Sequence, residues 1–128
     1  MIDRDLEDFG RTMGIEGLSF RDASCLKLAI ENGGDVYLQK VDEYLLFYIL
    51  KRVEERRLPS FCWEVLRMAY AQEAYPFFVH PVMFLEDQIG FSVRLRMEIC
   101  DLPTLTRVFR FLKDQMKKLE SSGGENIK

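Results

Sequence analysis

The chain has 128 residues, a net charge of -3 at pH 7 and a pI of about 5.3. This length suits one domain, and the acidic balance does not favour nucleic acid or an anionic membrane as a partner. The longest apolar run, 44–50, is too short to span a bilayer, and the charged start, 1–10, lacks the apolar stretch of a signal peptide. We therefore expect a cytoplasmic protein.

The first element expected along the chain is an amphipathic helix over 1–14. Its apolar side chains recur at helical spacing on one face: Ile2, Leu6, Phe9 and Met13. Gly14 offers a helix stop.

Four strands should follow, at 18–20, 26–30, 36–41 and 43–50. The Asn-Gly-Gly of 31–35 is a strong hairpin signal, because tight hairpin turns need positive φ. The run at 43–50 is apolar on both faces, which predicts a position in the middle of the sheet.

A charged connector, 51–60, leads to a second helix from Phe61 to about Ala74, with Ser60 as its N-cap. A strand ending at Leu85, a turn and a second strand come next. That second strand, Gly90 to Ile99, alternates strictly between apolar and polar residues.

The last helix should start at Thr104, or at Asp101 with Pro103 in its first turn, and run to about Glu120. We expect one domain, 1–120, and a disordered polar tail, 121–128. The order α-β-β-β-β-α-β-β-α predicts an α+β fold in which three helices flank a twisted antiparallel sheet.

Residues for catalysis or metal binding are scarce. The only histidine, His80, has no accompanying nucleophile motif, and the glycines form no phosphate loop. Cys25, Cys62 and Cys100 show no metal-ligand spacing, and their odd number favours reduced, mostly buried thiols. We therefore expect no catalytic residue, no metal, no cofactor and no enzymatic activity; a small enzyme built around His80 is the opposing hypothesis.

The second helix is apolar on two sides. Phe61, Val65, Met68 and Ala69 share one face, and Trp63, Leu66 and Tyr70 share nearly the opposite one. One sheet can cover only one side, so the second face needs either another protein or a long loop. Self-association is the commonest solution, which predicts a dimer interface at Trp63, Leu66 and Tyr70. A smaller apolar surplus around the first helix would suit an extended peptide added at a sheet edge.

Three stretches carry a resemblance to a known family: "LEDFGRTMGIEGLSF", "CLKLAIENGGDVYLQKVDEYLLFYIL" and "FSVRLRMEICDLPTLTRVFRFLKDQM". In order and spacing over 2–120 the chain resembles the class I chaperones of bacterial type III secretion, typified by the Tir and Yop effector chaperones. The connector 51–60 is more charged than the family pattern.

The resemblance implies a cytoplasmic homodimer of a Gram-negative bacterium. It would bind the N-terminal region of a secreted effector as an extended chain and keep it soluble and secretion-competent, without ATP, metal or membrane insertion. By position, the partner-binding apolar patch would comprise Phe9, Met13, Leu18, Phe20 and Leu28. Two alternatives stay open: one subunit of a heterodimeric chaperone for a secretion gate-keeper or needle component, and a related bacterial fold without a secretion role.

Overall fold

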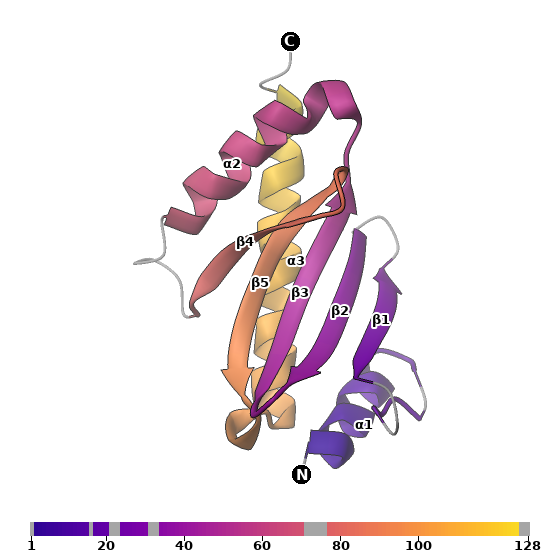
Figure 1. Cartoon of the computed structure of the whole chain (residues 1–128). Coiled ribbons are helices and arrows are strands. Elements are labelled where there is room, and N and C mark those ends of the chain that lie inside the picture. Colours follow the sequence, from indigo (N-terminus) through magenta and orange to yellow (C-terminus); the bar gives the residue numbers. More distant parts are fainter. Residues whose placement is uncertain (1, 16, 21–23, 31–33, 71–76, 126–128) are drawn as a thin grey trace.

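Figure 1 shows the computed structural model of the chain, which describes residues 2–15, 17–20, 24–30, 34–70 and 77–125. The helices are α1 (Ile2–Thr12), α2 (Leu58–Tyr70) and α3 (Leu102–Glu125). The strands are β1 (Cys25–Ile30), β2 (Gly34–Val41), β3 (Tyr44–Arg52), β4 (Val79–Phe84) and β5 (Gln88–Arg96). Short 3-10 turns, η1 (Glu55–Arg57) and η3 (Met97–Ile99), precede α2 and α3.

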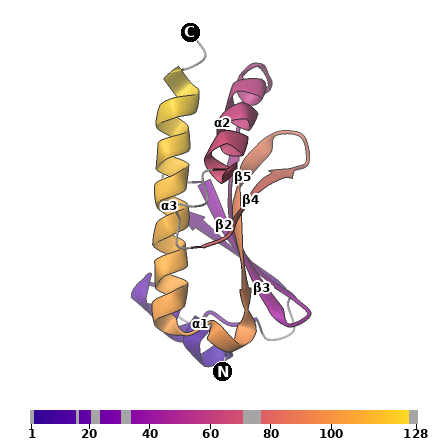
Figure 2. The same ribbon diagram turned by 90° about the vertical axis from the view of Figure 1, so that its left-hand side faces the viewer.

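The strands form one antiparallel sheet in the order β1-β2-β3-β5-β4. The central place of β3 confirms what its two apolar faces predicted. The α+β class, with an antiparallel sheet and three helices, is confirmed as well. Figure 2 shows that α1 and α3 lie on one side of the sheet, and α2 packs beside α3 at the β4 end.

The core lies between this sheet and the helices. Leu45, Phe47 and Ile49 alternate along the inner face of β3 and are fully buried. The Phe9 ring of α1 meets the Phe47 ring edge-on at a centroid distance of 5.9 Å, and Phe109 of α3 packs on Phe9 at 5.7 Å. Three elements far apart in sequence are therefore joined by one aromatic cluster, which fixes α1 against the sheet.

The separate strand predicted at 18–20 is wrong, since the described chain has five strands and this segment pairs with none of them. Leu18 and Phe20 are nevertheless buried. A Cβ built on Gly10 would lie 2.7 Å from the Leu18 Cβ, so the segment packs directly on α1. Side-chain burial, rather than backbone pairing, accounts for the apolar pattern that suggested a strand.

The end of α1 follows the prediction for Gly14, whose φ is +82°. Ile15 N donates to the Gly10 carbonyl at 2.7 Å, and Gly14 N donates to the Arg11 carbonyl at 3.1 Å. This pair of bonds is the Schellman motif, which satisfies carbonyls that the last helical turn leaves free. The hairpin predicted at 31–35 is confirmed by the pairing of β1 with β2, although 31–33 lie outside the described residues.

The start of α2 differs from the prediction, because the helix begins at Leu58 and Ser60 lies inside it rather than at its N-cap. Pro59 is compatible with the first helical turn, where its missing N–H has no intrahelical partner to lose. The alternation of the Gly90–Ile99 segment also ends early. Phe91, Val93 and Leu95 are buried, whereas Met97 and Ile99 belong to η3 and Ile99 is 51% exposed.

The start of α3 confirms the alternative in which Asp101 opens the helix and Pro103 lies in its first turn. Asp101 Oδ1 accepts a 2.9 Å hydrogen bond from Thr104 N, and the Asp101 carbonyl accepts one from Leu105 N. At its other end α3 continues to Glu125, past the expected end at Glu120. For residues 126–128, which lie outside the described residues, the disordered tail stays a prediction.

We expect Asp101→Ala to lower the urea midpoint of unfolding at pH 7, because it removes this N-cap. Hydrogen bonds from the Thr104 hydroxyl and then from its backbone N–H hold the pKa of Asp101 below its usual range. A lowered folded pKa stabilises the fold above the unfolded value, about 3.9, and that stabilisation is lost as the pH falls through the folded value. The variant's deficit should therefore shrink in acid. Asp101→Asn, which keeps a capping oxygen, is the control, and a deficit independent of pH would contradict the assignment.

Candidate functional site

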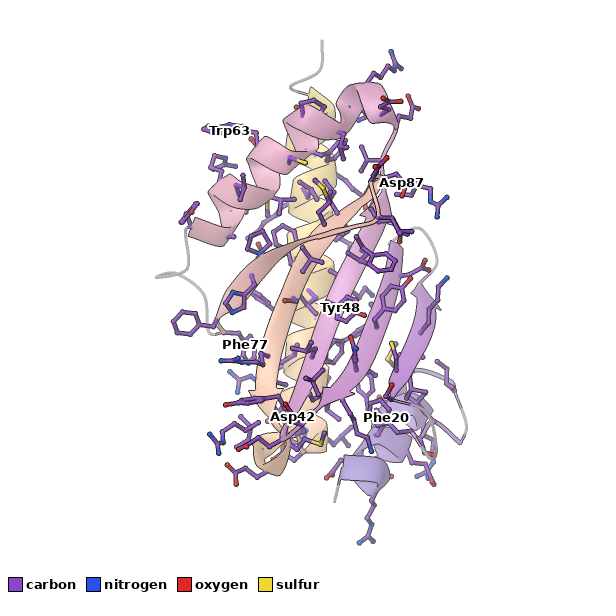
Figure 3. All side chains as sticks on the ribbon, in the orientation of Figure 1. Phe20, Asp42, Tyr48, Trp63, Phe77 and Asp87 are labelled. Atoms are coloured by element: carbon purple, nitrogen blue, oxygen red, sulfur yellow. The ribbon has the colours of Figure 1, made fainter. Side chains whose placement is uncertain are left out.

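The outer face of α2 is the first candidate site. Its predicted inner residues, Phe61, Val65, Met68 and Ala69, are all buried. Trp63 is 66% exposed, Leu66 44% and Tyr70 84%. The two-faced character of the helix is confirmed, and no loop among the described residues covers Trp63 and Leu66. Figure 3 shows Trp63 projecting outward from α2.

A groove of about 240 Å³ runs between α2 and the β4–β5 hairpin, on the inner face of the sheet. Cys62, Val65 and Leu66 line it from the helix, and Pro81, Met83 and Ile89 line it from the strands. Every one of these side chains is apolar. The groove adjoins the exposed face of α2 through Leu66, which belongs to both, so the two features form one continuous apolar surface.

The two edges of the sheet differ in their capacity to accept another strand. β4 forms one edge and contains Pro81, which has no N–H to donate. β1 forms the other edge and contains no proline. Lys40 N donates to the Ser24 carbonyl at 2.8 Å. Since hydrogen-bonded pairs alternate along an antiparallel ladder, the N–H and C=O of Lys27 point away from β2.

The predicted partner-binding patch is mostly inside the molecule. Phe9, Leu18, Phe20 and Leu28 are each at most 8% exposed, and Met13 alone is half-buried. The four buried residues belong to the core and Met13 packs against it, and Leu18 lies beside Gly10 of α1. The sequence pattern of a buried helix face and that of a binding face are alike, so periodicity could not separate them. The proposed contact of this patch with a partner stays a prediction.

The outer face of the sheet carries aromatic side chains. The Tyr37 and Tyr48 rings stack at 5.0 Å, and the Arg94 guanidinium lies 4.5 Å from the Tyr44 ring centroid. Burial is the main cause that raises the pKa of Tyr48 to about 12, and the nearby Cys25 is the next largest cause. Tyr48 is therefore neutral at physiological pH and is no candidate for a phenolate nucleophile.

His80 is exposed on β4, and its ring stacks on Phe78 at a centroid distance of 6.4 Å. None of the hydrogen bonds formed among the described residues links His80 to a nucleophile. The described residues contain no cluster of three or more His, Cys, Asp or Glu that could hold a metal ion. Among the cysteines, Cys100 is buried as expected, and burial raises its pKa to about 11. Cys25 is exposed, contrary to the expectation of buried thiols.

Within the described residues, no helix combines the length and apolarity that crossing a bilayer requires.

Two features of the site were missed by the sequence reasoning: the groove and the difference between the sheet edges. Pro81 could have indicated the blocked edge, since proline within a strand is confined to edges and bulges. The groove depends on how α2 crosses β4 and β5, for which the sequence offers no comparable signal.

Solved structures similar to this one include a chain of the HopA1–SchA chaperone–effector complex, with 22% identity, a TM-score of 0.69 and coverage of 92% of this chain and 91% of that one. A second is from the Yersinia pestis type III secretion chaperone SycH in complex with a YscM2 fragment, with 16% identity, a TM-score of 0.68 and coverage of 93% and 99%. A third is from the ExsC–ExsE complex, with 17% identity, a TM-score of 0.70 and coverage of 94% and 91%. At these identities the likeness establishes the fold.

No curated protein sequence matches the chain. A family model for the type III secretory system chaperone SycN matches residues 1–119. Because this match spans nearly the whole chain, the protein belongs to the SycN family of type III secretory system chaperones.

Proposed function

We propose that this chain binds the N-terminal region of a secreted effector as an extended segment and keeps it soluble and secretion-competent in the bacterial cytosol. The observation that carries the proposal is the family match over residues 1–119. Similar structures come from a chaperone–effector complex and from a chaperone bound to a protein fragment, which supports the same role. The role needs binding surfaces only, so we propose no enzymatic activity and no cofactor.

The β1 edge is the place where we propose that the effector segment binds. The outward N–H and C=O of Lys27 can pair with an added strand, which gives affinity without dependence on the segment's sequence. Met13, Ile15 and Leu26 are partly buried against the core, and Figure 1 shows α1 near the end of β1. They can receive apolar side chains of the segment, while Phe9 and its buried neighbours support them from beneath.

As a second partner we propose another copy of this chain. The homodimer would form through the outer face of α2, with Trp63, Leu66 and Tyr70 in the interface. Exposed aromatic and leucine side chains on one helix face favour a protein partner over solvent. The alternative, one subunit of a heterodimeric chaperone for a gate-keeper or needle component, would use the same face with a different small protein.

We expect Lys27→Pro to weaken effector binding by at least about tenfold, the cost of one lost backbone hydrogen bond whose acceptor stays unpaired in a desolvated interface. Proline removes the outward N–H but leaves the bonds from β1 to β2 in place. Lys27→Ala is the matched control, because it removes the 3.5 Å ion pair with Asp35 and keeps the N–H. Equal binding by the two variants, measured by titration calorimetry with the captured segment, would rule out strand addition at β1.

Capture from the native host tests the proposed function as a whole. The tagged chain should recover a secreted protein, identified by mass spectrometry. Recovery of a second small chaperone would favour the heterodimer. Recovery of neither would contradict the proposal.

A further inference from the structure

A row of basic side chains follows the face of α3 that points away from the core. The buried face of this helix consists of Leu105, Val108, Leu112, Met116 and Leu119. The other face carries four exposed cations, which we call the basic stripe: Arg107, Arg110, Lys117 and Lys118. Asp114 is the only acid between them. At a rise of roughly 1.5 Å per residue, the stripe extends about 16 Å along the helix axis.

The cations of the basic stripe differ from most other exposed cations of the described chain, which form ion pairs. Arg96, for example, pairs with Glu43 at 3.0 Å. Within the described residues, no member of the stripe has an ion-pair partner. The Arg107 guanidinium lies 5.5 Å from the Phe77 ring centroid, a contact that leaves its positive charge uncompensated. The stripe thus keeps its positive charge for a partner outside the chain.

The distribution of charge indicates the kind of partner. The stripe and Asp114 together carry +3 and the whole chain carries -3, so the remaining residues carry -6. Nucleic acid or an anionic bilayer would extend beyond the stripe and meet this negative surplus, which repels it. A partner whose acidic groups are confined to the stripe avoids that repulsion. A helix with carboxylates at i, i+3 and i+7 presents them on one face over a similar length.

We propose that the basic stripe binds an acidic helix of another protein. Its place in the fold separates it from the two surfaces proposed above. In Figure 1 the β1 edge and α2 lie on opposite sides of the sheet's front view, and α3 runs behind the sheet. The stripe can therefore be occupied while an effector segment and a second copy are bound, and the inference does not depend on either of them.

A synthetic helical peptide with glutamates at i, i+3, i+7 and i+10 on an alanine background is the probe, and its glutamine counterpart is the control. In a titration followed by NMR, the glutamate peptide should shift the amide resonances of 107–118 of the full chain. Its affinity should fall several-fold between about 0.02 and 0.5 M salt, since screening shortens the range of exposed charges to a few Å. The glutamine peptide should shift none of them.

Arg110→Glu should weaken binding of the glutamate peptide by at least about fivefold, because it replaces one attraction with a repulsion. Arg4→Glu is the matched control, since Arg4 is an exposed arginine of α1 and the change in net charge is the same. Equal weakening by the two variants would assign the binding to net charge and overturn the stripe as a site.

Two further measurements test the kind of partner and the independence of the site. Larger shifts of 107–118 with a DNA duplex, or with phosphatidylglycerol vesicles, would overturn a protein helix as the partner. Arg110→Glu should keep the mass and the effector capture of the wild type. Loss of either, with the fold intact, would place the stripe in a surface already described and overturn it as a separate site.

Discussion

Phe9→Ala should lower the free energy of unfolding by about 3–5 kcal/mol, the usual effect of removing a buried phenylalanine ring. Phe9 is 1% exposed and contacts Phe47 and Phe109, which belong to the central strand and the last helix. The substitution leaves a cavity where three elements meet, and these elements are too constrained to close it. Urea unfolding at a fixed protein concentration measures the effect.

Met13→Ala is the matched control, because Met13 lies one turn further along the same face of the chain and is only half-buried. We expect it to cost about 1 kcal/mol. A loss below about 1 kcal/mol for Phe9→Ala would show that the ring is not packed as described. The comparison also separates the two roles considered for Phe9, since a ring in a binding patch could be removed with little effect on stability.

Leu66→Glu should convert the proposed homodimer to a monomer. A carboxylate desolvated in an interface without a partner costs roughly 2–5 kcal/mol, which weakens association by roughly 30-fold to several thousandfold. In the monomer Leu66 is 44% exposed on a helix, so the glutamate remains hydrated and the fold is kept. Light scattering on the purified variant measures the mass, and circular dichroism checks the fold.

Leu66→Met, which keeps an apolar side chain of similar size, should remain a dimer. If Leu66→Glu were as dimeric as wild type, the interface would lie on a different face of the molecule. If wild type alone were a monomer or an aggregate rescued by a second small protein, the heterodimeric alternative would replace the homodimer.

Elements with strong periodicity could be predicted from the sequence. The two faces of α2 are a good example, because helical spacing places Phe61 and Val65 on a different side of the helix from Trp63 and Leu66. The stop at Gly14 and the cap at Asp101 are local signals that need no tertiary information. The central position of β3 followed from its nearly continuous apolar run, although the helices cover only its inner face.

Features that depend on three-dimensional context could not be predicted. Leu18 and Phe20 alternate like a strand, yet both are buried without pairing in the sheet, and Leu18 packs beside Gly10 of α1. Met97 continues the pattern of β5, but the chain turns into η3 there to reach the N-cap of α3. The sequence also marks buried and partner-binding apolar residues alike, which is why Phe9 and Leu28 looked available for a partner.

The most direct test of the account is limited proteolysis of the complex captured from the native host, followed by mass spectrometry. The chain should protect one continuous segment from the N-terminal region of a secreted protein, while the rest of that protein is digested. The same segment should lose protection when the chain carries Lys27→Pro, and keep it with Lys27→Ala. Protection of an internal folded domain, or of no segment at all, would contradict the proposal that this protein holds an extended N-terminal segment for secretion.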